Sequence, residues 1–123
     1  MKIKVSEATN IQLDWMVANA QHLNIIQVKG GVTYTSSYPK IGGAPYSPTT
    51  DWAQGGPIIE RESLSLTNRV YSDTGIVSTS NLWRAMTDHS TVEYGPTPLI
   101  AAMRCYVTSE LGDTIEVPDG LGE

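Results

Sequence analysis

The fold of this chain is decided most clearly by residues 95–112, GPTPLIAAMRCYVTSELG. Thr97 is a residue type that caps helix N-termini, and Pro98 follows at the first helical position, where its missing N–H costs nothing. Gly112 supplies the left-handed residue with which many helices end. The stretch therefore predicts a helix over residues 99–111. Small side chains within this helix would allow another element to approach it closely.

A second helix is predicted near the N-terminus, after a short strand at residues 1–5. Thr9 and Gln12 have the spacing of a capping box, in which each side chain bonds the backbone of the other residue. Apolar residues then recur at the helical spacing of three and four; they are Leu13, Met16, Val17, Ala20 and Leu23. A closing strand is predicted at residues 113–117, where apolar and polar residues alternate.

Turn residues divide the middle of the chain into hairpins and a long loop. Gly30-Gly31 predicts one hairpin turn, and residues 73–75, DTG, predict another. Residues 38–50, YPKIGGAPYSPTT, hold three prolines and two glycines, a composition typical of a loop. After the break expected at Gly55-Gly56, residues 57–67 are predicted to form a strand.

Together these elements predict an α+β fold, in which two helices pack on a small antiparallel sheet and a long Pro/Gly-rich loop lies at its edge. The length of 123 residues fits a single domain, residues 1–123. Residues 110–123 are acidic and contain no basic residue. They are interpreted as a solvated tail, with a contact for a basic partner as the alternative.

Composition excludes several classes of protein. The net charge is −5 and no stretch is strongly basic, so nucleic-acid binding is not expected. Cys105 is the single cysteine, which excludes an intramolecular disulfide. Apolar runs are too short to span a membrane, and the N-terminus lacks the apolar core of a signal peptide. No metal or cofactor is expected, because the sequence has no ligand pattern for one.

Two stretches resemble the signature blocks of a known family. They are residues 46–62, YSPTTDWAQGGPIIERE, and residues 95–117, GPTPLIAAMRCYVTSELGDTIEV. The opening, MKIKVSEATNIQLDWMVA, is similar to the start of the same family, the NinX-type proteins of tailed phages that infect enteric bacteria. The resemblance implies a phage accessory protein of the host cytoplasm, and it implies no catalytic residue.

The segment 46–62 is the best candidate for a ligand site, because it gathers side chains suited to a nucleotide. Aromatic rings offer stacking faces, paired glycines let a ligand approach the backbone, and polar groups can bond a ribose, a base edge or a phosphate. The candidate residues are Tyr46, Asp51, Trp52, Gln54, Gly55, Gly56 and Arg61. The alternative is a structured loop in which Trp52 fills the core and Arg61 pairs with a neighbouring glutamate.

Two further candidates lie on the helix predicted at residues 99–111. Thr97 begins this helix, and a helix N-terminus can hold a phosphate or a carboxylate, although simple capping is the alternative. Arg104 lies mid-helix and could reach a ligand or a partner subunit, or be solvated or salt-bridged. The ligand hypothesis gains if residues 46–62 and 95–99 meet in space. Cys105 is interpreted as a small core residue.

Three functions remain open from the sequence. The first is capture, without turnover, of a small host molecule, most simply a nucleotide-type signal of host defence. The second is a protein-interaction inhibitor or adaptor that acts on a host or phage protein. The third is a small hydrolase or transferase, which is disfavoured because only a few carboxylates or a histidine are available as a general base. Self-association into a homo-oligomer is also expected.

Overall fold

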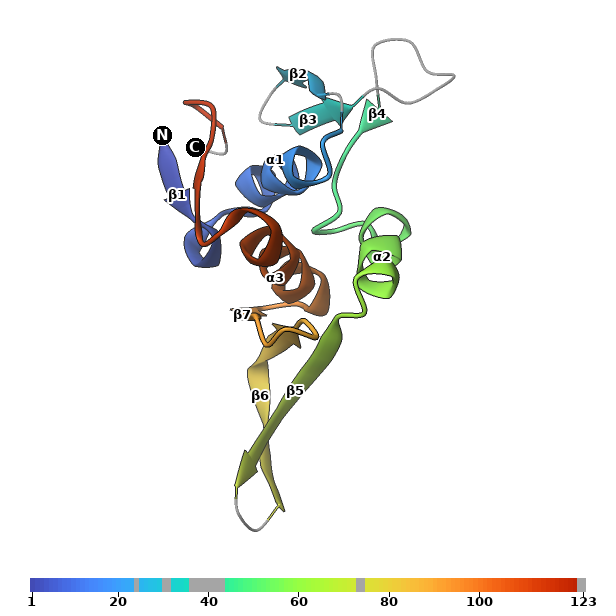
Figure 1. Ribbon diagram of the computed structural model, residues 1–123, viewed down its shortest axis with the longest axis vertical. Helices are drawn as coiled ribbons and strands as arrows, with labels where there is room; N and C mark the ends of the chain where they lie inside the picture. The colour runs from blue at the N-terminus through green and yellow to red at the C-terminus, as the bar shows by residue number, and fades with distance from the viewer. Residues whose placement is uncertain (24, 30–31, 36–43, 73–74, 122–123) are drawn as a thin grey trace.

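Three helices form the centre of the molecule and small sheets surround them, in the computed structural model of the chain (Figure 1). The structure describes residues 1–23, 25–29, 32–35, 44–72 and 75–121. Within these ranges the helices are α1 (Asn10–Ala20), α2 (Trp52–Arg61) and α3 (Pro98–Leu111). The α+β class is therefore confirmed, although the prediction of two helices missed α2.

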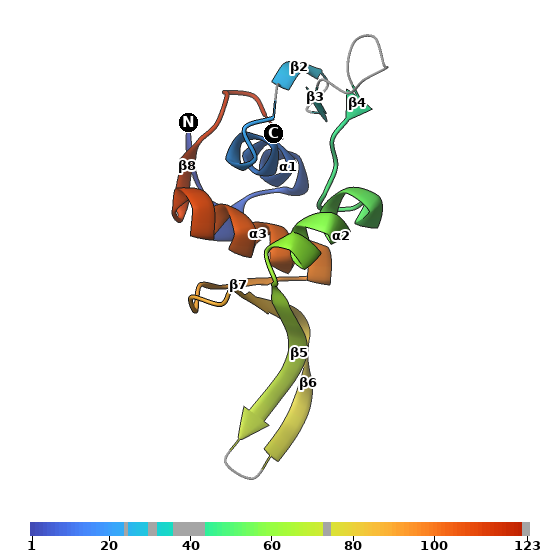
Figure 2. The same cartoon turned by 45° about the vertical axis from the view of Figure 1, so that its right-hand side comes forward.

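The central element is α3, which packs against α1, α2 and the strands around it (Figures 1 and 2). The Thr97 hydroxyl accepts a hydrogen bond from the Ile100 N–H at 3.1 Å, so the predicted cap is confirmed. Gly112 follows the helix with φ of 96°, in the region that favours glycine. Cys105 is fully buried, and its Sγ lies 3.3 Å from the Thr91 carbonyl oxygen. Burial raises the pKa of this thiol to about 11, as suits a core residue.

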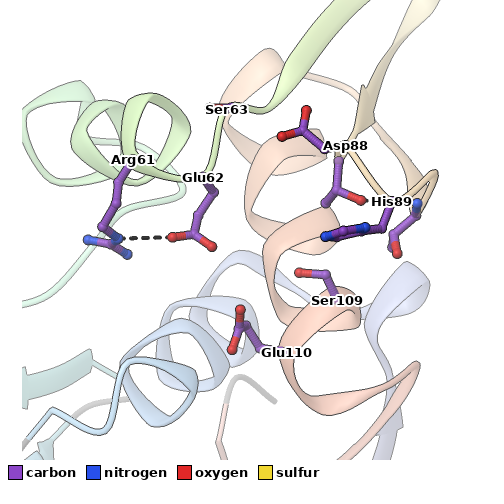
Figure 3. A pocket seen from close by; sticks show the side chains of 9 residues that line it. Arg61, Glu62, Ser63, Asp88, His89, Ser109 and Glu110 are labelled. Atoms are coloured by element: carbon purple, nitrogen blue, oxygen red, sulfur yellow. Dashed lines mark hydrogen bonds and ion pairs between the residues drawn. The ribbon is translucent and has the colours of Figure 1, made fainter.

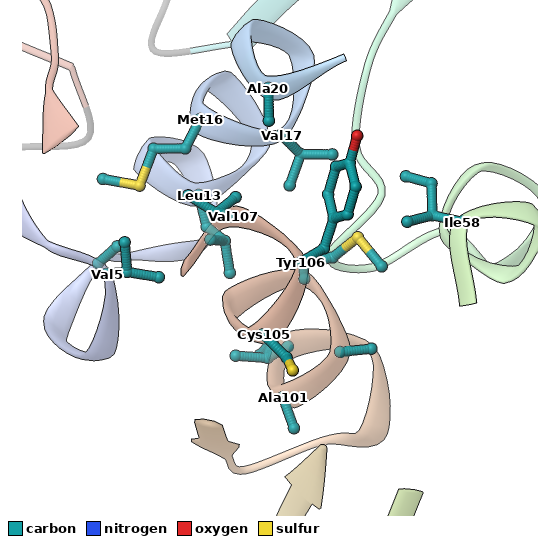
Figure 4. Close-up of a cluster of buried hydrophobic side chains, with 14 of the residues drawn as sticks. Val5, Leu13, Met16, Val17, Ala20, Ile58, Ala101, Cys105, Tyr106 and Val107 are labelled. Atoms are coloured by element: carbon teal, nitrogen blue, oxygen red, sulfur yellow. The ribbon is translucent and has the colours of Figure 1, made fainter. Parts of the chain in front are cut away.

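The core lies where α1, α2 and α3 meet, and Figure 4 shows its side chains. Residues from α1 and α3 face one another, and the small η1 turn (Val5–Glu7) and α2 close the sides. Ile58 of α2 is 1% exposed, so this helix is anchored by an apolar contact. Fully buried members of the core include Val5, Leu13, Met16, Val17, Ala101, Met103 and Val107.

The N-terminus of α1 carries the predicted capping box. The Thr9 hydroxyl accepts from the Gln12 N–H at 3.3 Å, and the Gln12 Oε1 accepts from the Thr9 N–H at 3.0 Å. Gln12 also donates through Nε2 to the Leu121 carbonyl oxygen at 3.2 Å, which ties the helix to the end of the described chain.

We expect Thr9→Ala to lower the free energy of unfolding by about 1 kcal/mol, because one helix N–H loses its acceptor. Urea unfolding followed by circular dichroism measures this change. Thr9→Ser keeps the hydroxyl and is expected to retain most of the stability. Equal losses in the two variants would contradict the capping role.

Within the described ranges, the strands form three separate antiparallel sheets rather than the single sheet that the sequence predicted. One pairs the two ends of the chain and places Ile3 opposite Ile115. The fold wraps strands around a central helix pair, so each sheet packs on a different side of it. The sheets are β1–β8 (Lys2–Lys4, Thr114–Glu116), β2–β3–β4 (Ile25–Lys29, Val32–Thr35, Ala44–Pro45) and β5–β6–β7 (Ser65–Ser72, Gly75–Met86, Val92–Gly95).

The prediction of a strand at residues 57–67 is wrong in its first half, because residues 52–61 are helical and β5 begins at Ser65. A break is predicted at Gly55-Gly56, before a strand that begins at Pro57, yet all three residues lie inside α2. The helix forms because the Asp51 carboxylate caps it, accepting from the Ala53 N–H at 2.9 Å, and because Ile58 is buried against the core. Tertiary packing here overrides local helix propensity.

The strand pairs of both predicted hairpins are present, as β2–β3 and β5–β6. The predicted turn residues 30–31 and 73–74, and residues 38–43 of the predicted loop, lie outside the described residues. Residues 44–45 form β4, and the chain turns at residues 48–50 before α2. The acidic segment contributes β8, and the Val117 N–H donates to the Met1 carbonyl oxygen at 2.8 Å. Leu121 is buried. In the parts that the structure describes, no helix is long and apolar enough to cross a membrane.

Candidate functional site

A groove of about 280 Å³ lies between the beginning of α2 and the beginning of α3. Three separate parts of the chain form it: the first residue of α1, the turn that leads into α2, and the first turn of α3. None of its lining residues carries a charge. They are Asn10, Thr49, Thr50, Trp52, Thr97, Pro98, Leu99 and Ile100. Residues of segments 46–62 and 95–99 therefore meet here, the arrangement that would favour the ligand hypothesis.

Close approach of the two segments depends on Gly55. A Cβ atom at this position would lie 2.5 Å from the Pro48 carbonyl oxygen and 2.6 Å from Leu99 Cδ2. Glycine is therefore needed for packing, which lets α2 and its leading turn sit directly against α3. Gly56 has a different environment, because a Cβ there would meet only Trp52 Cε3, at 3.9 Å.

Trp52 forms one wall of the groove and is 55% exposed. The alternative in which Trp52 fills the core is therefore wrong. It is the first residue of α2, directly after the Asp51 cap, so its backbone is held by the helix while its ring remains open to solvent. An exposed tryptophan beside an apolar wall is a surface on which a flat ring can stack.

The floor of the groove rests on a buried polar contact. Thr49 is 2% exposed, and its N–H donates to Asp14 Oδ1 of α1 at 3.0 Å. Asp14 is only 8% exposed. Burial raises the pKa of its carboxyl group to about 6, and the hydrogen bond from the Thr49 backbone partly opposes that rise. This contact fixes the turn at residues 48–50 to α1.

The first turn of α3 offers little to an anion. The Thr97 hydroxyl accepts from Ile100 N–H, the Thr97 carbonyl accepts from Ala101 N–H at 3.0 Å, and Pro98 has no N–H. Capping therefore satisfies most of the donors that a helix N-terminus would otherwise present. The predicted anion site at Thr97 is mainly a cap, although Thr97 does line the groove.

Several predicted ligand residues instead hold the segment together. Gln54 Oε1 accepts from the Ser47 N–H at 2.6 Å, and its Nε2 donates to the Pro45 carbonyl oxygen at 3.0 Å. Tyr46 is half-buried, and its hydroxyl oxygen accepts from Gln21 Nε2. Burial raises the pKa of this phenol, which therefore stays neutral. Asp51 is the helix cap.

Both predicted arginines lie outside the groove. Arg61 is at the opposite end of α2, where its Nε pairs with Glu62 Oε2 at 3.0 Å and its Nη2 donates to Gln21 Oε1 at 3.3 Å. Arg104 donates to the carbonyl oxygens of Tyr94 at 2.9 Å and Ala8 at 3.2 Å. Partial burial lowers the pKa of Arg104. The alternative in which Arg61 pairs with a neighbouring glutamate is confirmed. Arg104 connects α3 to β7 and to the N-terminal segment through its two hydrogen bonds.

Of the nine predicted ligand residues, Trp52 and Thr97 line the groove. Asn10, Thr50 and the apolar residues at the start of α3 also line the groove and were not among the predicted residues. Thr50 could have been found by its closeness to Trp52 in the chain. Asn10 carried no signal, because only the packing of α1 against α3 brings it to this place.

A second cavity, of about 360 Å³, lies at the C-terminal end of α2 near the end of α3 (Figure 3). It is polar, and the Arg61–Glu62 ion pair lies at its edge. Acidic side chains outnumber basic ones around it. The lining residues are Arg61, Glu62, Ser63, Thr87, Asp88, His89, Thr91, Ser109 and Glu110. Among the described residues, no group of three or more acidic, histidine or cysteine side chains is arranged to hold a metal ion.

Comparison with known proteins gives one family. The family model described as Bacteriophage P22, NinX matches residues 4–110. This chain belongs to the NinX family of phage proteins. All residues that line the groove lie within this match, which covers residues 46–62 and the part of 95–117 up to residue 110. The resemblance to the family is therefore confirmed. No curated protein matches the chain.

Proposed function

We propose that this phage protein captures a small nucleotide-type molecule in the host cytoplasm and holds it without turnover, as a form of counter-defence. The observation that carries the proposal is the groove, in which segments of three different elements surround an exposed Trp52. A volume of about 280 Å³ is close to the lower end of the range for small-molecule sites, and suits a nucleobase.

The polar groups of segment 46–62 support binding rather than reaction. Asp51 is engaged as a helix cap and Glu62 as the partner of Arg61, so neither carboxylate is directed to the groove. The walls of the groove come from helices and from a turn fixed by the Asp14–Thr49 hydrogen bond. A site preformed in this way binds with a small cost in ordering.

We expect Trp52→Ala to weaken nucleotide binding by roughly tenfold or more, because stacking on an aromatic side chain contributes about 1–3 kcal/mol per base. Native mass spectrometry of the protein with a panel of mono-, di- and cyclic nucleotides measures the adduct. Because Trp52 is largely exposed, the variant should fold normally.

Two variants serve as matched controls. Tyr94→Ala removes another exposed ring, away from the groove, and Arg61→Ala removes the cation beside Glu62. Both are expected to keep the adduct. An adduct that survives Trp52→Ala, or that disappears in Arg61→Ala, would contradict binding in this groove. If no nucleotide binds to the unmodified protein, the capture function itself fails.

A second candidate function is favoured by the β5–β6 hairpin, which extends away from the body (Figures 1 and 2). β7 pairs only with residues 83–86 of β6, while β5 and β6 continue to pair with each other out to Ser72 and Gly75. A two-stranded ribbon is marginally stable alone in water, and strand edges can pair with another chain. We propose contact with another protein, either a second copy or a host or phage partner, as the alternative function.

Shortening the hairpin tests this alternative. Residues 69–79 are replaced by a two-residue turn, and the molar mass is measured by light scattering during size-exclusion chromatography. An oligomer that becomes a monomer supports self-association through the hairpin. Equal masses before and after shortening, together with equal capture of host proteins, would contradict the second function.

A further inference from the structure

We infer that the groove binds an uncharged, adenine-type ring through contacts with the face and the edge of the ring, and that an attached phosphate does not contribute to affinity. Trp52 supplies the stacking face and Asn10 supplies the edge contact. The inference rests on the proposed capture of a nucleotide-type molecule, and it names the part of that molecule which determines affinity.

The absence of charge around the groove is the first step. All eight lining residues are uncharged, and both arginines that were expected to bind phosphate are engaged elsewhere with Glu62, Gln21 and backbone carbonyls. The donors of the first turn of α3 are mostly bonded to Thr97, and Pro98 has none. Among the residues that line the groove, a phosphate would meet no cation, and the net charge of the protein is −5. Binding energy must therefore come from the ring.

The polar groups that remain determine which ring fits. Thr97 is engaged as a cap, and Thr49 is buried beneath the surface with its N–H bonded to Asp14. Asn10 is exposed at the first position of α1, and its side-chain amide presents a donor beside an acceptor. An amide of this kind pairs with the exocyclic amine and the adjacent ring nitrogen of adenine. Thr50 adds one hydroxyl at the same rim.

A thermodynamic cycle tests the edge contact. Isothermal titration calorimetry compares adenosine with purine riboside, which lacks the exocyclic amine, for the unmodified protein and for Asn10→Leu. The unmodified protein should bind adenosine roughly tenfold more tightly than purine riboside. Asn10→Leu should bind the two equally. Asn19→Leu is the matched control, because Asn19 is also exposed on α1 but does not line the groove, and it should keep the difference.

The phosphate arm uses adenosine and adenosine monophosphate at low and at high salt, about 50 and about 300 mM. Their dissociation constants should agree within about threefold and should change little with salt, since no phosphate–cation contact is formed. Much tighter, salt-sensitive binding of the monophosphate would overturn the inference. The inference would also be overturned if Asn10→Leu kept the same preference for adenosine over purine riboside as the unmodified protein.

The experiments distinguish a failure of the proposed capture function from a failure of the inferred adenine-type ring. If adenosine does not bind but another nucleotide gives an adduct that Trp52→Ala removes, the inferred ring is wrong and the capture function stands. If neither the two nucleosides nor any member of the nucleotide panel binds, both are overturned. Thermal unfolding of Asn10→Leu verifies that the variant is folded.

Discussion

Gly55→Ala is expected to lower the free energy of unfolding by about 2 kcal/mol or more. The added Cβ would lie 2.5 Å from the Pro48 carbonyl oxygen and 2.6 Å from Leu99 Cδ2, so backbone must move to admit it. Overpacking of this kind costs about 1–3 kcal/mol, and here it outweighs the better helix propensity of alanine. Chemical unfolding followed by circular dichroism measures the change. The variant should also bind ligand more weakly, because Leu99 lines the groove.

Gly56→Ala is the matched control for this prediction. It lies one residue along the same helix, and a Cβ there would meet only Trp52 Cε3, at 3.9 Å. Alanine should therefore stabilise the protein, by roughly 0.5–1 kcal/mol, through helix propensity. Opposite signs for the two neighbouring substitutions are expected. Similar gains from both would show that α2 does not approach Pro48 and α3 as closely as described.

Asp14→Asn is expected to stabilise the protein at neutral pH by up to about 3 kcal/mol, the value of a pKa raised by roughly two units. Burial raises the carboxyl pKa from 3.8 in the unfolded chain to about 6 in the folded protein. Well below the unfolded pKa of 3.8, the carboxyl group is protonated in both states. As the pH rises from about 4 to about 6, the unfolded chain releases its proton first, so the folded state becomes relatively less stable. Above about pH 6, the ionised Asp14 carboxylate destabilises the folded state by its full amount.

The measurement is the free energy of unfolding of the unmodified protein and the variant between about pH 3.5 and about pH 8. Asp14→Asn keeps an oxygen to accept from Thr49 N–H, so the two stabilities should converge at the acid end and separate at neutral pH. Glu7→Gln, on the exposed surface of the η1 turn, is the control and should change stability by less than about 0.5 kcal/mol at any pH. A stability difference between the unmodified protein and Asp14→Asn that does not vary with pH would contradict the buried carboxyl.

Local signals in the sequence were sufficient for both ends of α3 and for the start of α1, whereas the apolar pattern that runs to Leu23 extends past the end of α1 at Ala20. Thr97, Pro98 and Gly112 bracket α3, and Thr9 with Gln12 begins α1, because caps depend on residues only a few positions apart. The glycines of α2 were misinterpreted for the opposite reason. Gly55 is required by contacts with Pro48 and with Leu99, which is far away in the chain, and local sequence cannot distinguish a glycine that breaks a helix from one that permits close packing.

Sequence reasoning singled out two segments that line one groove in the structure, but most of the side chains it named do not line that groove. Segment 46–62 and the beginning of α3 do form one groove, and Trp52 faces it. Gln54 and Arg61 were expected to meet a ligand, but their partners are inside the protein, at Ser47, Pro45, Glu62 and Gln21. When the hydrogen-bond partner of a polar side chain lies in another element, the sequence does not reveal that partner, so the side chain is easily predicted to be available to a ligand. Only the folded chain shows which polar groups remain available.

A nuclear magnetic resonance titration tests binding in the Trp52 groove most directly. Amide shifts of isotope-labelled protein are followed as the tightest nucleotide or nucleoside of the panel is added. We expect shifts to concentrate at Asn10, at residues 49–52 and at residues 97–100, with the Trp52 indole N–H among the largest. Shifts that concentrate instead at Arg61, His89 and Glu110, around the polar cavity, would contradict this site.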